Sequence, residues 1–237
     1  MHWLLPAIAT AASAAFAVAV LRQYGRRRRP YQLAWGAALA MFAVASLALT
    51  VGVASGWTPL GFKAYYLFGA ILNVPWLGLG TVLLLGRPAV ARGYLVALVA
   101  FSAASVALLA AAPVTAADLA GKLVPEGRDF LPVADRVLAV VGNVAGTLIV
   151  VGGAVASGLA LRHQRHLRSR FEGNLLIALG VLLAASGGVF AFLARSEQLA
   201  AGLAAGSCVM YLGFRRASSP VRSPAPSGQG RARPAGP

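Results

Sequence analysis

The sequence predicts an all-α fold, a polytopic membrane protein built as a bundle of seven transmembrane helices, with its N-terminus outside and its C-terminus in the cytoplasm. Of its 237 residues, 59% are hydrophobic and only 11% are charged. Soluble domains carry about 25% charged residues, so this chain has too few charges to cover a surface that faces water. The charges gather in separators between apolar stretches of about 20 residues, the length that a helix needs to cross the hydrocarbon core of a membrane.

Seven apolar stretches are predicted to be helices, because lipid offers no hydrogen bonds and each backbone polar group must find a partner within its own segment. The stretches cover residues 3–21, 31–54, 64–86, 91–112, 137–161, 173–194 and 197–214. The first is not expected to be a signal peptide, because no Lys or Arg precedes it, whereas Arg22 and the four arginines at 26–29 follow it. The seventh is short and rich in Ala and Gly. It is kept because the arginine-rich C-terminus would otherwise lie outside.

The basic residues determine the predicted orientation. With the N-terminus outside, only Lys63, Lys122, Arg128, Arg136 and Arg195 fall in outside segments, and the remaining arginines fall inside. This is the positive-inside pattern of plasma-membrane proteins. The net charge of +15 is thus predicted to lie at the cytoplasmic face, with anionic lipid headgroups as its partners. Nucleic acid is not expected as a partner, because the basic segments are short and not interleaved with aromatic residues.

Residues 1–216 are predicted to form one transmembrane domain, and residues 217–237 a disordered cytoplasmic tail. The tail is rich in Pro, Ser, Gly and Arg and has no apolar surface to bury. One sizeable outer loop is predicted between residues 113 and 136. In it, Thr115 and Asp118 have the spacing of a capping box, which predicts a short helix through Lys122.

No residue pattern predicts catalysis, a metal site or a cofactor. Every Asp, Glu, Lys, Arg and His falls in a predicted loop or at the end of a predicted span. A haem carrier would need histidines within spans, and a proton pump or an intramembrane hydrolase would need ionisable groups there. His163 and His166 are close in sequence, but the arginines around them would repel a metal cation. Cys208 lies in an apolar stretch and is expected to be a small packing residue.

The third and fifth predicted spans carry the few polar residues of the membrane domain, spaced as on one face of a helix. The five residues of this polar stripe are Tyr66, Asn73, Trp76, Asn143 and Thr147. Two interpretations stay open. The amides could hydrogen-bond from helix to helix, each bond contributing about 1 kcal/mol. Alternatively, the five side chains could line a binding site for a small neutral or lipid-like molecule.

Two further features of these spans predict how the helices pack. Pro75 has no N–H to donate and is expected to kink the third span. The fifth span carries small residues four apart, at Gly142 and Gly146 and again at Gly153 and Ser157. This spacing is typical of close contacts between membrane helices.

Three stretches resemble segments of other bacterial proteins. They are RPYQLAWG from Arg29 to Gly36, YYLFGAILNVPWLGLGT from Tyr65 to Thr81, and GNLLIALG from Gly173 to Gly180. In these stretches the chain resembles a group of uncharacterised seven-span membrane proteins from high-GC bacteria, over most of its membrane portion but not its tail. The resemblance implies the seven-span fold and no particular activity.

Together these observations predict a non-enzymatic integral protein of the bacterial plasma membrane, acting as a subunit, scaffold or sensor. Its basic inner face and tail are expected to meet membrane lipids or a protein partner that the sequence does not identify. The alternative is a transporter or binder of a small neutral or lipid-like molecule, which would use the polar stripe of the third and fifth spans.

Overall fold

The computed structural model describes residues 3–86, 88–161, 176, 179, 180, 183 and 196–218, and every regular element in these residues is a helix. The elements are α1 (Leu4–Arg27), α2 (Pro30–Ser55), α3 (Pro59–Tyr65), η1 (Tyr66–Leu72), α4 (Asn73–Leu84), α5 (Pro88–Ala111), α6 (Ala116–Leu119), α7 (Gly127–Phe130), α8 (Val133–Leu161) and α10 (Ser196–Ser218). The all-α prediction is confirmed for this part of the chain.

Among the described residues, five helices are long and apolar enough to cross a membrane, which fits a multi-pass membrane protein. They are α1, α2, the third helix (the continuous run α3–η1–α4), α5 and α8, and they match the first five predicted spans. The predicted sixth span and the tail from residue 219 lie outside the described residues, apart from four isolated positions of the span. In α10 the apolar segment Ala204–Gly213 is shorter than a span. The count of seven and the orientation therefore stay predictions.

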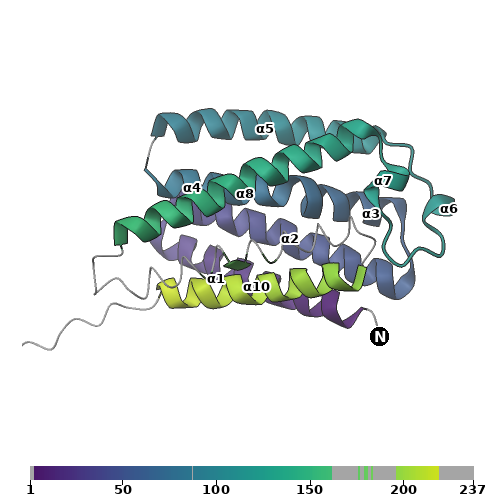
Figure 1. Ribbon diagram of the computed structural model, residues 1–237, viewed down its shortest axis with the longest axis horizontal. Coiled ribbons are helices and arrows are strands. Elements are labelled where there is room, and N and C mark those ends of the chain that lie inside the picture. Colours follow the sequence, from purple (N-terminus) through teal and green to yellow (C-terminus); the bar gives the residue numbers. More distant parts are fainter. Residues whose placement is uncertain are drawn as a thin grey trace, which may run out of the picture.

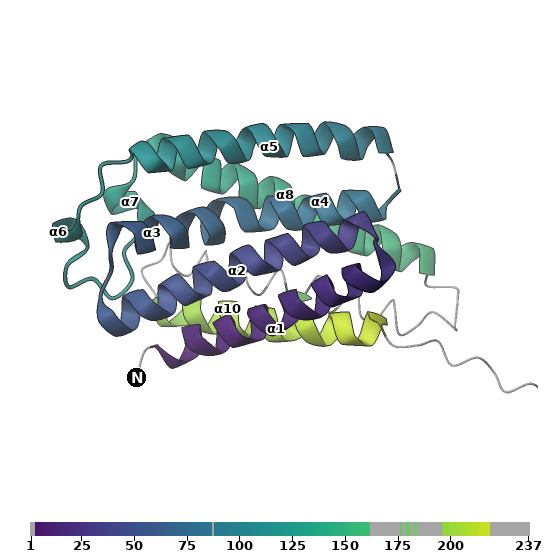
Figure 2. The same ribbon diagram turned by 180° about the vertical axis from the view of Figure 1, so that it is seen from behind.

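The helices pack in a row that begins with α10 and ends with α5. α1 lies between α10 and α2, α2 packs on the third helix, and α4 packs on both α8 and α5. Figures 1 and 2 show the long helices running along one axis, with α8 crossing α4 obliquely. The short helices α6 and α7 lie at the same end as the N-terminus. We call this the loop end, and we call the opposite end, where α1 stops and α2 starts, the arginine end.

The turn between α1 and α2 contains an unusual arginine. α1 continues to Arg27, past the predicted end at residue 21, and Arg28 then adopts a left-handed conformation with φ 51°. Glycine usually occupies such a position, because a Cβ there costs about 1 kcal/mol. The N–H of Arg28 donates to the Tyr24 carbonyl at 2.7 Å, and its guanidinium lies 5.8 Å from the centroid of the Tyr24 ring. This cation–π contact offsets part of the cost.

The third helix changes its winding just before Pro75. Residues Tyr66–Leu72 form the π-helix η1, and the α-helix resumes at Asn73. Pro75 has no N–H, so it can donate neither to the carbonyl of Ile71, four residues back, nor to that of Ala70, five residues back. The predicted disturbance at Pro75 thus takes the form of a wide turn that precedes the proline.

α8 crosses the third helix through glycines. A Cβ on Gly146 would lie 2.7 Å from the carbonyl carbon and oxygen of Val74, and a Cβ on Gly142 would lie 2.9 Å from the carbonyl oxygen of Ile71. These neighbours are backbone atoms, so no side-chain rotation could make room. The small-residue spacing read from the sequence therefore corresponds to a close helix contact at these two positions.

Two alanine substitutions on α8 test this crossing. Gly146→Ala is expected to destabilise the protein by about 1–3 kcal/mol, because the added methyl group forces the two backbones apart. Gly152→Ala is the matched control, since no atom lies within 4 Å of its Cβ position. It should leave stability unchanged or raise it slightly, because alanine is the better helix former. Thermal unfolding of both purified variants in detergent makes the comparison, and equal midpoints would contradict the packing described here.

Candidate functional site

Asn143 of the polar stripe hydrogen-bonds to the third helix. Its Nδ2 donates to the carbonyl of Ala70 in η1 and, at 2.9 Å, to the carbonyl of Ala139 one turn earlier on α8. Both hydrogens of the amide nitrogen are thereby used. The Ala70 carbonyl lies five residues before Pro75, which has no N–H to donate to it, and Asn143 gives this carbonyl a donor from a neighbouring helix.

Two aromatic side chains also donate to carbonyls of α4. Tyr94 of α5 donates its hydroxyl to the carbonyl of Pro75 at 2.9 Å, and Trp35 of α2 donates its indole N–H to the carbonyl of Leu77 at 3.2 Å. With Asn143, this gives the third helix a hydrogen bond from each of three neighbouring helices. These polar groups therefore hold the bundle together around Pro75.

The other residues of the polar stripe have different surroundings. Trp76 donates its indole N–H to the hydroxyl of Ser102 on α5 at 3.2 Å. Tyr66 lies at the loop end, where a Cβ on Gly127 would come within 2.4 Å of its ring. Both aromatic rings border the same buried apolar cluster, which consists of Ile71, Leu72 and Ala139.

Asn73 and Thr147 are half-buried, and neither forms a hydrogen bond with another described residue. The Tyr66 hydroxyl likewise forms no hydrogen bond with a described residue, so only Trp76 and Asn143 of the stripe use their polar groups between the described helices. That Tyr66, Asn73, Trp76, Asn143 and Thr147 together bind a ligand stays a prediction.

The outer loop packs over the loop end of the bundle. Trp57 donates its indole N–H to the carbonyl of Leu123 at 3.0 Å, and its ring belongs to a buried cluster with Phe62, Leu119 and Leu131. This cluster joins the start of the third helix to the loop. The loop is therefore part of the folded structure at this end.

The predicted capping box at Thr115 is confirmed. The Thr115 hydroxyl accepts from the Asp118 N–H at 3.4 Å, and the Asp118 carboxylate accepts from the hydroxyl and the N–H of Thr115 at 2.7 and 2.9 Å. These bonds favour the charged form and hold the pKa of the exposed Asp118 carboxyl below its usual value. The helix α6 ends at Leu119 and not at Lys122, because the chain turns at Gly121 with φ 71°.

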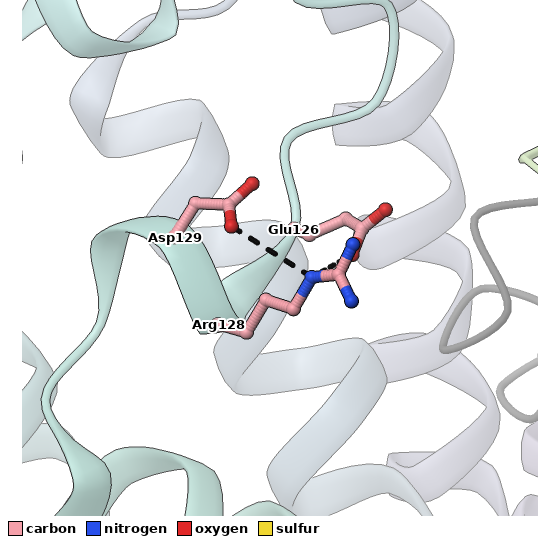
Figure 3. Close-up of polar contacts among 3 residues, drawn as sticks. All are labelled: Glu126, Arg128 and Asp129. Atoms are coloured by element: carbon pink, nitrogen blue, oxygen red, sulfur yellow. Dashed lines mark ion pairs between the residues drawn. The ribbon is translucent and has the colours of Figure 1, made fainter.

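The acidic residues of the loop end do not converge on one site. Glu126 and Asp129 both pair with Arg128, at 2.7 and 3.7 Å from its Nε (Figure 3). Asp118 belongs to the capping box, and Asp135 is buried away from them under the loop. Within the described residues, no group of three or more His, Cys, Asp or Glu side chains could hold a metal ion.

Asp135 differs from its predicted position in the outer loop. α8 begins at Val133, so Asp135 lies in the first turn of a helix and is only 1% exposed. Its Oδ1 has no hydrogen-bond partner among the described residues, and the positive charge of Lys63 acts on its carboxylate. Lys63 in turn donates to the carbonyls of Ala110 and Ala112 at 2.9 and 2.8 Å, at the end of α5. An acidic residue soon after a proline is typical of the first turn of a helix, so the sequence could have indicated that α8 includes Asp135. The burial of Asp135 could not have been predicted, because it depends on how the chain folds around it.

A second correction concerns Cys208, which was expected to pack inside the bundle. It is exposed on α10. Ala204, Ser207 and Met210 form the buried face of this helix, and Cys208 lies off that face. Hydropathy placed Cys208 in an apolar segment but could not say which side of the helix faces α1.

An apolar groove lies between α1, α2, α4, α8 and α10, in the halves of these helices that adjoin the arginine end. It is partly open to the surroundings, and its cavity volume is about 50 Å³. Its walls include Phe16, Val20, Trp35, Leu77, Val150 and Met210. The polar groups of Trp35 and Thr81, which also line it, both bond to the Leu77 carbonyl, so the walls offer mainly apolar surface.

Comparisons with protein families, curated proteins and solved structures found no match for this chain. The resemblance to uncharacterised seven-span proteins therefore rests on the three sequence stretches alone. The function has to be argued from the site geometry and from the distribution of charge.

Substitutions in the polar stripe separate packing from ligand binding. Asn143→Leu should lower the stability of the protein by about 1 kcal/mol, because it removes the hydrogen bond from α8 to the Ala70 carbonyl. Asn73→Leu should leave stability nearly unchanged, since Asn73 bonds to no other described residue. Unfolding midpoints in detergent measure both. A large loss of stability in Asn73→Leu would show that this amide, too, joins helices and is not free for a ligand.

Lys63 is expected to stabilise the loop end. Lys63→Met should remove the side-chain donor to the carbonyls of Ala110 and Ala112 and the positive charge of Lys63 that acts on Asp135. Amide hydrogen exchange in the last turn of α5 should accelerate on the order of tenfold, which corresponds to about 1.4 kcal/mol. Lys122→Met, at an exposed lysine of the same loop, is the control and should not change exchange in α5.

Proposed function

We propose that the chain is a non-enzymatic protein of the bacterial plasma membrane that crosses the membrane seven times, with its N-terminus outside and its C-terminus in the cytoplasm. It serves as a subunit or scaffold that holds a basic face against the anionic lipids of the inner leaflet. The observation that carries this proposal is the separation of charge between the two ends of the bundle.

The arginine end brings together basic residues that lie far apart in the sequence. Arg22 and the arginines at 26–29 lie at the end of α1, Arg92 in the first turns of α5, and Arg215 near the end of α10, and all are exposed. No acidic residue of the described chain falls in these segments. Such a face is attracted to anionic headgroups by about 1 kcal/mol for each basic residue near the surface.

The loop end is close to neutral by comparison. Arg128 is paired with Glu126 and Asp129, and the positive charge of Lys63 acts on the Asp135 carboxylate. The polar groups at this end hold the loop and the helix ends in place, which supports a structural role for them and not a catalytic one. The asymmetry between the ends is the pattern expected of a bundle whose arginine end faces the cytoplasm.

The surface of α5 supports the role of a subunit. Only 17% of the most apolar 18-residue stretch of α5 is buried within the bundle, whereas the corresponding share is 28–44% in the other four spans. Val96 is 71% exposed and Val99 53% exposed. A helix at the edge of a bundle with so little cover can contact lipid or a protein partner.

A second candidate function is a transporter or binder of a small neutral or lipid-like molecule through the polar stripe. The observation that favours it is that Asn73 and Thr147 are half-buried but form no hydrogen bond with another described residue. A half-buried amide without a side-chain partner in the described helices can still donate to or accept from a ligand.

Cysteine labelling in whole cells tests the proposed orientation. In a Cys208→Ser background, Ala117→Cys lies on the exposed surface of the loop end, and Gly25→Cys lies near the arginine end with open space around it. A maleimide that cannot cross membranes should label Ala117→Cys in intact cells and Gly25→Cys only after the cells are opened. A third variant, Ser223→Cys in the tail, should behave like Gly25→Cys.

The pattern of labelling decides the proposal. Labelling of Gly25→Cys in intact cells would invert the orientation and overturn it. Labelling of Ser223→Cys in intact cells, with Gly25→Cys protected, would show an even number of spans and remove the seventh.

A further inference from the structure

The apolar groove has the shape and surface of a site for a hydrocarbon chain. Along α4 its wall runs from Leu77 to Leu85, which is about 12 Å of helix. Phe16 and Val20 of α1 and Val150 of α8 form the facing walls. Because the groove is apolar and partly open, an acyl chain from the surrounding bilayer is better suited to it than a polar solute.

Two walls of the groove continue toward the arginine end beyond the residues that line it, and we call this end of the groove its mouth. Tyr24 lies one turn beyond Val20 on the same face of α1, and Tyr31 lies one turn before Trp35 on α2. The rings of Tyr31 and Trp35 are in contact, with centroids 5.3 Å apart. Each wall therefore passes from apolar side chains to a tyrosine hydroxyl as it reaches the end of the bundle.

A positive charge lies next to Tyr24. The Arg28 guanidinium is 5.8 Å from the Tyr24 ring centroid, and the backbone of Arg28 is left-handed. Arg28 is exposed, so its N–H groups can reach a ligand. A guanidinium with neighbouring hydroxyls is well suited to a phosphodiester, which accepts charge-assisted hydrogen bonds.

We propose that the groove binds one anionic glycerophospholipid, with an acyl chain between α1, α4 and α8 and the phosphodiester headgroup at Arg28, Tyr24 and Tyr31. This inference gives the contact with anionic lipid in the proposed function a defined site, and it rests on that proposal for the leaflet that supplies the lipid. The charge at the mouth selects an anionic lipid over a zwitterionic one, and the apolar walls distinguish the site from a purely electrostatic contact.

Native mass spectrometry of the full chain in a mild detergent tests the site. The protein is titrated with phosphatidylglycerol or with phosphatidylcholine of identical acyl chains. The expected result is one phosphatidylglycerol that stays bound at activation energies that remove all other lipid, with at least tenfold weaker retention of phosphatidylcholine.

Two pairs of variants locate the lipid. Ala154→Leu places a larger side chain in the groove and should lower retention of phosphatidylglycerol at least tenfold, whereas Ala156→Leu, on an exposed face of the same helix, should not. Arg28→Gly removes the charge while it relieves the left-handed backbone, so the variant should fold well. It should lose the preference for phosphatidylglycerol, whereas Arg92→Gln, at the same end on α5, should keep it.

Three outcomes would overturn the site. Retention that Ala154→Leu leaves unchanged, in a variant with a normal unfolding midpoint, would place the lipid outside the groove. An equal loss of preference in Arg28→Gly and Arg92→Gln would reduce the effect to net charge. Tight retention of oleate, but not of phosphatidylglycerol, would make the ligand a fatty acid. Because the titration is done in detergent, its failure is independent of the orientation that cysteine labelling tests.

Discussion

A backbone carbonyl inside a bilayer has no water to accept from, and this constraint governs how the described helices meet around Pro75. Pro75 has no N–H to donate to the carbonyls before it, and Asn143, Tyr94 and Trp35 each donate to a carbonyl of the third helix from a different neighbour. Such bonds require the helices to approach closely, and Gly146 allows it because it places no side chain against the opposite backbone. The π-helix, the three donors and the close glycine contact therefore lie together around Pro75.

The two ends of the bundle differ in their hydrogen bonds and in their charge. At the loop end, Trp57 and Lys63 fix the loop and a helix end by hydrogen bonds to carbonyls, and the buried Asp135 balances part of the positive charge. At the arginine end, no acidic residue falls in the described segments that carry the arginines. The described residues therefore place a nearly neutral end and a basic end at opposite ends of the bundle.

Hydropathy alone predicted the first five spans, because about 20 consecutive apolar residues have few other stable states. The capping box at Thr115 was predictable because its hydrogen bonds join residues only three positions apart, so the local sequence specifies it. The π-helix before Pro75, the burial of Asp135 and the outward position of Cys208 were not predictable. Each depends on which neighbouring helix or loop covers a given face, and no local pattern carries that information.

Arg28 breaks a local rule that the rest of the described chain obeys, because every other residue there with positive φ is a glycine. A chain that needed only a tight turn between α1 and α2 would be more stable with glycine at this position. Departures of this kind mark places where the side chain does something that the more stable residue cannot. Here the guanidinium lies over the Tyr24 ring, and Tyr24 follows the groove residue Val20 by one helical turn. The backbone of the turn and the surface of the groove are independent observations, and both favour an anionic amphiphile as the ligand.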